Sequence, residues 1–176
     1  EFCNTLSIMQ GLSPVYTIDK NPDPENGNIY DDVKWQVSWN IDADGYRLPC
    51  EAEWEYAARG GNKSKGYQYS GSDNIDAVAW YDMISGFKTH PIATKAANEL
   101  GFYDFSGNVS EWCYDFFTYY GFPKINCENG RGVSCSYQGG SWNWDAEYVR
   151  VSFRYGSYAD DRNGSIGFRL SRTVRL

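Results

Sequence analysis

Hydrophobic residues recur along the chain in short groups, and few of these groups keep one period for long. Near the N-terminus, Phe2, Leu6, Met9 and Leu12 lie three or four residues apart. This spacing predicts an amphipathic helix that is ended by Gly11.

The clearest helix is expected at residues 50–61. Pro49 precedes it, acidic residues fill its first turn, Arg59 favours its C-terminal end and Gly60 can adopt the left-handed cap. Cys50 stands at the N-cap, where Thr or Ser would complete a capping box with Glu53. Because cysteine caps a helix poorly, Cys50→Thr is expected to stabilise the protein by roughly 0.5–1 kcal/mol.

Short strands are expected at 16–18 and 33–37, on either side of a turn-rich surface loop at 21–28, and a hairpin would join them. Residues 155–165 have neither the strand period nor the helix period, so they are expected to form a loop. The apolar residues 167–170 suit a strand. Loops held between rigid ends are where binding residues concentrate.

The composition fits one α+β domain, 1–176, with few regular elements and many loops. The 176 residues include 18% aromatics and 18 Gly, which favours a core of Trp, Tyr and Phe. No run approaches the roughly 20 apolar residues of a membrane span. The first residues resemble the middle of a helix, so part of the N-terminal region, with any targeting signal, is expected upstream.

The charge argues against a nucleic-acid partner. The net charge is −7, whereas nucleic-acid binding normally needs a basic face. Arginines gather near the C-terminus and are expected to bridge loops by pairing with aspartates; they are Arg150, Arg154, Arg162, Arg169, Arg172 and Arg175.

The five cysteines show no CxxC spacing and His90 is the single histidine, so a Cys/His zinc site is not expected. Cys127 and Cys135 flank a short segment. They either close a small loop in an oxidising compartment or remain scattered reduced thiols. His90 beside Pro91 is expected to be structural.

Oxygen-bearing residues cluster around a glycine turn at Asp104, Gly107, Asn108 and Glu111. Carboxylates mixed with backbone carbonyls suit Ca²⁺, which takes six to eight oxygen ligands. A polar turn whose side chains bond the nearby backbone is the alternative.

Four motifs in order resemble those of the formylglycine-generating-enzyme (sulfatase-modifying factor) family. They lie at residues 47–61, 101–112, 139–142 (Gly-Gly-Ser-Trp) and 167–170 (Gly-Phe-Arg-Leu). The resemblance covers nearly the whole chain and implies a C-type-lectin-like fold.

In the enzymes of that family, two cysteines after the Gly-Gly-Ser motif carry out the oxidation. The matching positions here are Trp144 and Val149. Neither residue can bind copper or activate oxygen, since that chemistry needs thiolates. The resemblance therefore implies a protein without copper and without oxidase activity. An iron-dependent modifying enzyme is the alternative, and it would need a His/carboxylate cluster that His90 alone hardly supplies.

The resemblance also implies a structural calcium site. Asp104 and Glu111 would give side-chain oxygens, and Gly107 and Val109 would give backbone carbonyls. The family usually has Asn at the position of Asp104, a change that keeps the oxygen and adds charge.

A second resemblance concerns residues 139–170, which are similar to the variable region of the Treponema-type variable proteins. In such proteins a retroelement randomises template adenines, mostly in AAY codons. Trp144 and Glu147 cannot arise in this way. The other non-framework residues can: Asn143, Asp145, Tyr148, Phe153, Tyr155, Gly156, Ser157, Tyr158, Asp160, Asp161, Asn163, Gly164 and Ser165.

The resulting hypothesis is a non-enzymatic receptor or adhesin-like protein that displays a diversified surface to an unknown protein or glycan. The resemblance implies a bacterial cell surface or periplasmic location, with a lipid anchor on an upstream segment. The alternative is that the aromatics of this region fold inward as core. The expected ligand-binding residues are Asn143, Trp144, Asp145, Glu147, Tyr148, Phe153, Tyr155, Ser157, Tyr158, Asp160, Asp161, Asn163 and Ser165.

Overall fold

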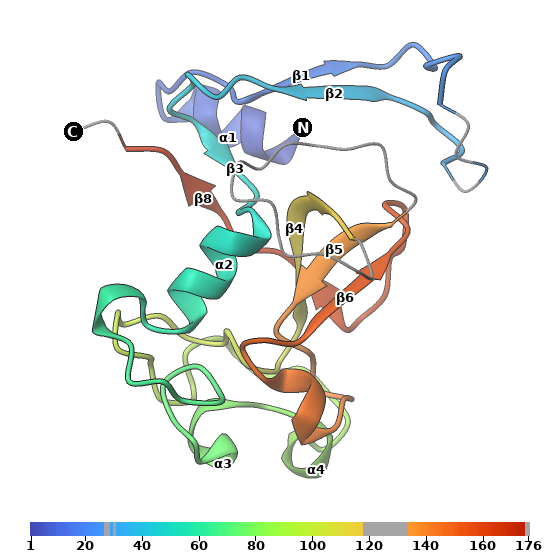
Figure 1. Ribbon diagram of the computed structural model, residues 1–176. Coiled ribbons are helices and arrows are strands. Elements are labelled where there is room, and N and C mark those ends of the chain that lie inside the picture. Colours follow the sequence, from blue (N-terminus) through green and yellow to red (C-terminus); the bar gives the residue numbers. More distant parts are fainter. Residues whose placement is uncertain (27–28, 30, 118–133, 175–176) are drawn as a thin grey trace.

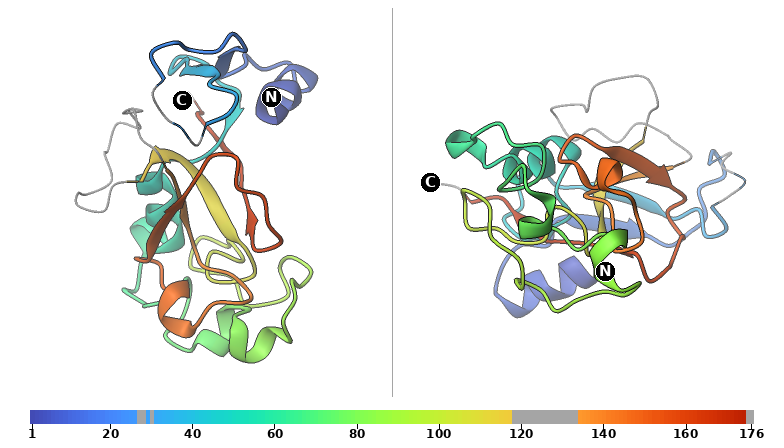
Figure 2. Two further views of the ribbon diagram at one scale, coloured as in Figure 1. Left: turned by 90° about the vertical axis from the view of Figure 1, so that its right-hand side faces the viewer. Right: turned by 90° about the horizontal axis from the view of Figure 1, so that it is seen from below.

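The computed structural model describes residues 1–26, 29, 31–117 and 134–174. A helix and a hairpin lie at one end, a sheet lies in the middle, and short helices lie at the other end (Figures 1 and 2). The elements are α1 (Phe2–Met9), β1 (Tyr16–Asp19), β2 (Gln36–Trp39), β3 (Tyr46–Arg47), α2 (Glu51–Ala58), η1 (Gly61–Lys63), α3 (Ile75–Val78), α4 (Asp82–Ser85), β4 (Ser110–Phe116), β5 (Cys135–Gln138), η2 (Ala146–Val149), β6 (Arg154–Ser157), β7 (Ile166–Gly167) and β8 (Ser171–Arg172).

The largest sheet has four strands in the order β6-β5-β4-β7. Its β6–β5 and β5–β4 pairs are antiparallel and its β4–β7 pair is parallel. The pairs β1–β2 and β3–β8 form separate two-stranded sheets. This mixture of short strands and short helices confirms the expected α+β class.

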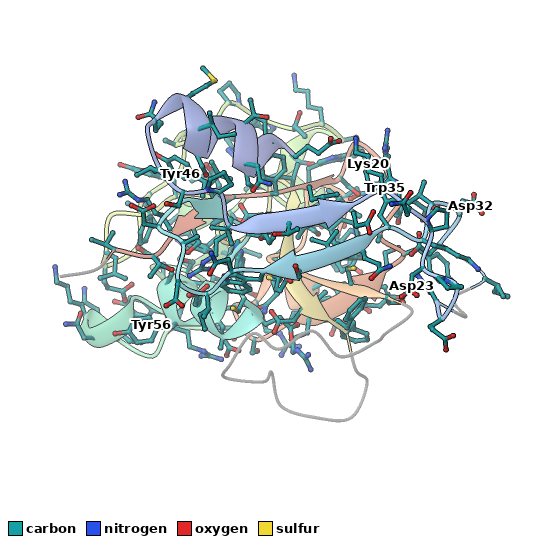
Figure 3. All side chains as sticks on the ribbon, turned by 90° about the horizontal axis from the view of Figure 1, so that it is seen from above. Lys20, Asp23, Asp32, Trp35, Tyr46 and Tyr56 are labelled. Atoms are coloured by element: carbon teal, nitrogen blue, oxygen red, sulfur yellow. The ribbon has the colours of Figure 1, made fainter. Side chains whose placement is uncertain are left out.

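The predicted N-terminal helix and the following hairpin are both present. Strands β1 and β2 pair antiparallel, with Tyr16 opposite Trp39. Strand β2 begins later than expected because Lys34 has a φ of 50°, a left-handed conformation outside the strand region. At the tip of the hairpin, the Lys20 ammonium lies 4.7 Å from the Trp35 ring centroid (Figure 3).

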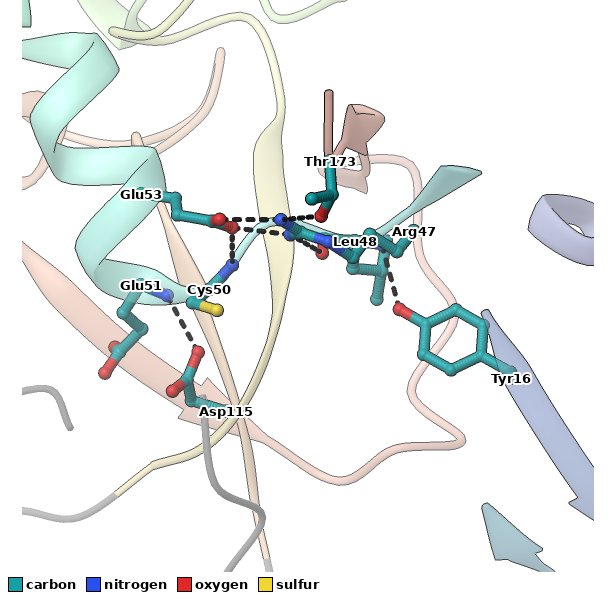
Figure 4. Close-up of polar contacts among 8 residues, drawn as sticks. All are labelled: Tyr16, Arg47, Leu48, Cys50, Glu51, Glu53, Asp115 and Thr173. Atoms are coloured by element: carbon teal, nitrogen blue, oxygen red, sulfur yellow. Dashed lines mark hydrogen bonds and ion pairs between the residues drawn. The ribbon is translucent and has the colours of Figure 1, made fainter. Parts of the chain in front are cut away.

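Helix α2 forms as predicted, and Gly60 takes the left-handed conformation after it, with a φ of 85°. The Glu53 carboxylate accepts a hydrogen bond from the backbone N–H of Cys50 at 3.0 Å. It also pairs with Arg47, whose Nη1 lies 2.6 Å from Oε2 (Figure 4).

The expectation for Cys50→Thr and the small-loop alternative for Cys127 and Cys135 both need correction. Cys50 is disulfide-bonded, so its sulfur is part of a cross-link and the prediction that Cys50→Thr stabilises the protein is wrong. Cys135 is a free thiol, so it does not close a small loop with Cys127. Cys127 itself lies outside the described residues.

Two aromatic-rich clusters form the core. The first packs Trp54 of α2 against Phe105, with ring centroids 4.9 Å apart in an edge-to-face arrangement. The second surrounds Val149 with Tyr69 and Tyr81. Edge-to-face packing is favourable for aromatic rings beyond their burial, so these contacts agree with the predicted aromatic core.

Part of the expected loop at 155–165 is a strand. Residues Arg154–Ser157 form β6, which pairs with β5 from Cys135 to Gln138. The partner strand supplies the hydrogen bonds, so this element does not depend on a local hydrophobic period. At 167–170, where a strand was expected, the strand β7 already ends at Gly167 and Phe168 is exposed.

Candidate functional site

The Gly-Gly-Ser-Trp turn begins the segment 139–170, which we call the variable segment after its resemblance to the variable region described above. The turn holds this segment against the rest of the fold. Gly140 has a φ of 62°, and a Cβ there would lie 2.4 Å from the carbonyl oxygen of Tyr148. Only glycine allows this approach. The Trp142 indole N–H donates to the carbonyl of Gly164 at 3.1 Å, which ties the turn to the end of the segment.

None of the predicted ligand-binding residues is buried. Three tyrosines that might have joined the core are exposed: Tyr148 by 36%, Tyr155 by 44% and Tyr158 by 39%. The inward-folding alternative is therefore wrong for them. Asn143, Asp145, Glu147, Asp160 and Asn163 are also exposed, while Trp144, Phe153, Ser157, Asp161 and Ser165 are half-buried.

Four of these residues form an aromatic patch: Trp144, Tyr148, Phe153 and Tyr155. The Trp144 ring lies 5.7 Å from Tyr148, 5.6 Å from Phe153 and 5.7 Å from Tyr155, and Tyr148 lies 5.0 Å from Phe153. Beneath them, the buried Tyr137 of β5 lies 6.1 Å from Trp144. Trp144 is thus the centre of the patch.

The two positions of the family's catalytic cysteines have other uses here. Trp144 organises the aromatic patch, and Val149 is fully buried in the core. Free thiols within the described residues belong to Cys3, Cys113 and Cys135, and none lies in the 139–170 segment. Burial raises the pKa of all three, for Cys135 to about 11, so each is protonated at neutral pH.

Three acidic residues lie near Trp144: Asp145 and Glu147 in the sequence, and Asp82 through a backbone hydrogen bond. We call Asp82, Asp145 and Glu147 the carboxylate cluster. Asp82, at the start of α4, donates its backbone N–H to the Trp144 carbonyl at 3.2 Å. A hydrogen bond to the Asp82 carboxyl group, together with its negative charge, raises the pKa of Asp145. Glu147 likewise raises the pKa of Tyr148. Like charges therefore crowd one edge of the patch.

This crowding predicts that Asp145→Asn raises the melting temperature at about pH 7. A raised folded-state pKa means that the repulsion acts above that pKa and is relieved as protons bind at lower pH. The gain should therefore shrink towards about pH 3, as thermal melts can show. Asp160→Asn removes a carboxylate of the same segment that does not act on Asp145, and should give no comparable gain. Equal gains at both pH values would contradict this account.

The variable segment is fastened to the framework by buried ion pairs. Arg154 of β6 places Nη2 2.6 Å and Nε 3.0 Å from the carboxylate oxygens of Glu51, which is 1% exposed. Arg169 pairs with both oxygens of Glu111, and its guanidinium lies 3.6 Å from the Phe105 ring centroid. Among the described C-terminal arginines, Arg154 and Arg169 form ion pairs, with glutamates in place of the expected aspartates. Arg150 and Arg172 donate to backbone oxygens instead.

Two of the predicted calcium ligands, Asp104 and Glu111, are carboxylates with different surroundings. The Asp104 Oδ2 accepts the Ala93 N–H at 2.8 Å, while Oδ1 is buried and has no partner among the described residues. The Glu111 Oε2 accepts from Trp54 and Arg169, whereas Oε1 accepts only from Arg169. A carboxylate oxygen has two lone pairs, so Oε1 keeps one that can bind a cation.

His90 has the structural role expected of it. Its ring stacks on Trp80 with centroids 3.7 Å apart, and its Nε2 lies 2.7 Å from the Ser85 carbonyl oxygen. Across the described part of the chain, no three His, Cys, Asp or Glu side chains gather in a metal-binding group. The residue set of an iron-dependent enzyme is thus not found in that part.

Two residues that lie beside Trp144 in the fold could not be predicted from the sequence. Asp82 comes from a helix of four residues far from the variable segment, and Tyr137 lies on β5 beneath the patch. Only the folded arrangement brings either one to Trp144. The helices within the described residues are also short, and none is long and apolar enough to span a bilayer.

Comparison with known proteins identifies the family. Residues 1–174 match the sulfatase-modifying factor enzyme 1-like domain. Chaperone protein LppX of Paenibacillus barcinonensis is 41% identical over 191 residues, covering 98% of this chain and 66% of that protein. The formylglycine-generating enzyme of Streptomyces coelicolor is 34% identical over 166 residues, covering 80% of this chain and 52% of that enzyme.

A solved structure agrees. Treponema denticola variable protein 1 superposes with a TM-score of 0.78 and 32% identity, covering 96% of this chain and 66% of that one. The expected C-type-lectin-like fold of the formylglycine-generating-enzyme type is thereby confirmed. This chain spans about half to two-thirds of the length of the curated relatives. By its sequence and its fold, the chain belongs to the family of sulfatase-modifying factor enzyme 1-like domains.

Proposed function

We propose that this protein is a non-enzymatic receptor or adhesin-like protein that binds a protein or glycan through residues 139–170. The observation that carries the proposal is the aromatic patch, in which Tyr148 and Tyr155 are exposed around the half-buried Trp144. Trp144 stands at a position where the family's enzymes have a cysteine. A second cysteine position is the buried Val149. The segment thus offers contact area where the enzymes offer thiols.

The chemistry of the segment supports binding. Tyrosine supplies large, rigid contact area at low entropic cost, while Ser, Gly and Asn adapt their hydrogen bonds to a partner. Exposed aromatic patches on a monomer commonly mark interaction sites. Two relatives bear names that suit a binding role, a variable protein and a chaperone protein. We place the protein at the bacterial cell surface or in the periplasm, held by a lipid anchor.

Sequencing the gene neighbourhood and sister genes tests the proposal. We expect a near-identical template copy of residues 139–170 next to a reverse transcriptase gene. Differences between sisters should concentrate at exposed positions such as Asn143, Tyr148 and Tyr155, and spare Gly140 and Val149. Differences spread evenly along the chain would overturn the proposal.

We further propose that Asp104 and Glu111 hold a structural Ca²⁺ with the carbonyls of Gly107 and Val109. The buried Asp104 Oδ1 supports this, because an orphaned carboxylate oxygen is costly unless something binds it. Calcium at a hundredfold excess over its Kd is expected to stabilise the protein by about 2–3 kcal/mol in melts against EDTA.

The control variants for calcium exploit the left-handed backbone at Asp104, whose φ is 58°. Asp104→Asn keeps one oxygen, and Asp104→Gly removes the side chain, while both residues tolerate this conformation. The calcium effect should persist in the first variant and vanish in the second. An effect of equal size in both would place the ion elsewhere.

A further inference from the structure

We propose that the surface around Trp144 and Tyr148, at the end of the aromatic patch beside the carboxylate cluster, binds a basic side chain, lysine or arginine, of a protein partner. This inference rests on the proposed binding function and narrows its ligand. The carboxylate cluster, Asp82, Asp145 and Glu147, would supply negative charge beside the cation, while Trp144 and Tyr148 supply the aromatic contact. The geometry thereby favours a protein segment with exposed basic residues over a neutral glycan.

The aromatic rings supply the first half of the site. Trp144 and Tyr148 meet edge to face, with centroids 5.7 Å apart and an interplanar angle of 83°. Tyr148 is also 36% exposed. A cation over the face of Trp or Tyr is attracted by the ring quadrupole, and Trp is the strongest of the aromatic partners.

The carboxylates supply the second half of the site, and their mutual repulsion is unfavourable in the free protein. The Asp82 N–H donates to the carbonyl oxygen of Trp144, the residue before Asp145, and the Asp82 Oδ1 is buried with no partner among the described residues. Hydrogen bonding to Asp82 and its negative charge raise the pKa of Asp145. Two carboxylates in contact repel each other unless a proton or a cation lies between them. A bound ammonium or guanidinium would remove that repulsion.

The ion pairs of the described residues do not involve this cluster. Within the described residues, none of the three carboxylates takes part in an ion pair. Arg154 and Arg169 are bound to Glu51 and Glu111. Arg150, the nearest arginine in sequence, donates its Nε to the backbone oxygen of Glu147 at 2.8 Å and not to a carboxylate.

The site also reaches beyond the variable segment. Asp82 begins α4, and its neighbour Met83 is 77% exposed. Helix α4 lies beside η2 at the end of the molecule opposite the hairpin (Figure 1). A partner at this end would therefore touch Asp82 and Met83 of α4 as well as residues of the segment 139–170.

The test uses the whole chain and short peptides as probes. Pentalysine amide, pentaglutamate amide, a neutral Gly-Ser pentapeptide and a neutral oligosaccharide are titrated at low salt. The signal followed is the indole N–H of Trp144, assigned with Trp144→Phe. We expect pentalysine to shift this signal, and its affinity to fall severalfold at roughly physiological salt, because screening weakens exposed charge pairs.

Matched variants separate the cluster from total charge. Asp145→Asn with Glu147→Gln should weaken pentalysine binding about tenfold, each lost contact being worth about 0.5–1 kcal/mol at an exposed site. Asp23→Asn with Asp32→Asn removes the same charge at the far hairpin (Figure 3) and should change it less than about twofold.

Equal effects of the two double variants, or no shift with pentalysine, would overturn the inference. The neutral peptide or the oligosaccharide could instead shift the Trp144 signal, equally in the wild type and in Asp145→Asn with Glu147→Gln. That result would also overturn the inference of a basic ligand, but it would support a binding surface at Trp144. The proposed function fails separately, if sister sequences vary evenly along the chain.

Discussion

Arg154→Ala is expected to lower the free energy of unfolding by about 3–5 kcal/mol. The substitution leaves the Glu51 carboxylate, which is 1% exposed, without the guanidinium that now binds both its oxygens. A buried charge without its partner carries a desolvation cost that nothing offsets. Denaturant unfolding followed by tryptophan fluorescence measures the loss.

Arg150→Ala is the matched control, because Arg150 lies in the same segment and bonds only a backbone oxygen among the described contacts. It should cost about 0.5 kcal/mol or less, as surface substitutions usually do. Adding Glu51→Gln to Arg154→Ala removes the stranded charge and should recover part of the loss. A loss below about 1 kcal/mol for Arg154→Ala would mean that water reaches Glu51.

Cys50→Ser is expected to cost about 2–4 kcal/mol under oxidising conditions, because it removes a disulfide that restricts the unfolded chain. Both the wild type and the variant are unfolded with and without a reductant. The difference between them should shrink when the disulfide of the wild type is reduced, leaving only the small effect of the side-chain change.

Cys135→Ser serves as the control, since Cys135 is a free thiol and its loss breaks no cross-link. It should leave the effect of the reductant intact. Alkylation of the unreduced, denatured protein followed by mass spectrometry should label Cys3, Cys113 and Cys135 and spare Cys50. Labelling of Cys50 would contradict the disulfide and the predicted loss together.

Local signals predicted the elements that local chemistry determines. Pro49 and the acidic first turn mark the start of α2, and Gly60 adopts the left-handed conformation that ends it. The hairpin follows from two apolar groups around a turn-rich loop. The ordered motifs predicted the family, and with it the fold, because each motif is a short segment whose shape depends on its own residues.

Contacts between segments that are distant in the sequence could not be predicted from such local signals. Strand β6 exists because β5 pairs with it. Asp82 of α4 donates its backbone N–H to the Trp144 carbonyl, a contact that no pattern around residue 82 predicts. The disulfide of Cys50 was missed for the same reason, since spacing along the chain does not show which thiols meet. Asp82 and Tyr137, which lie beside Trp144 in the fold, were not among the residues singled out from the sequence.

The pleat of β6 has a consequence for how this protein can evolve. Successive side chains of a strand point to opposite faces, so Arg154 and Gly156 share one face, and Tyr155 and Ser157 share the other. Arg154 is held by Glu51, and a Cβ at Gly156 would lie 2.5 Å from the side chain of Phe117. Under the proposed binding function, substitutions at Tyr155 and Ser157 would change the contact surface, whereas substitutions at Arg154 and Gly156 would disturb the packing of the strand.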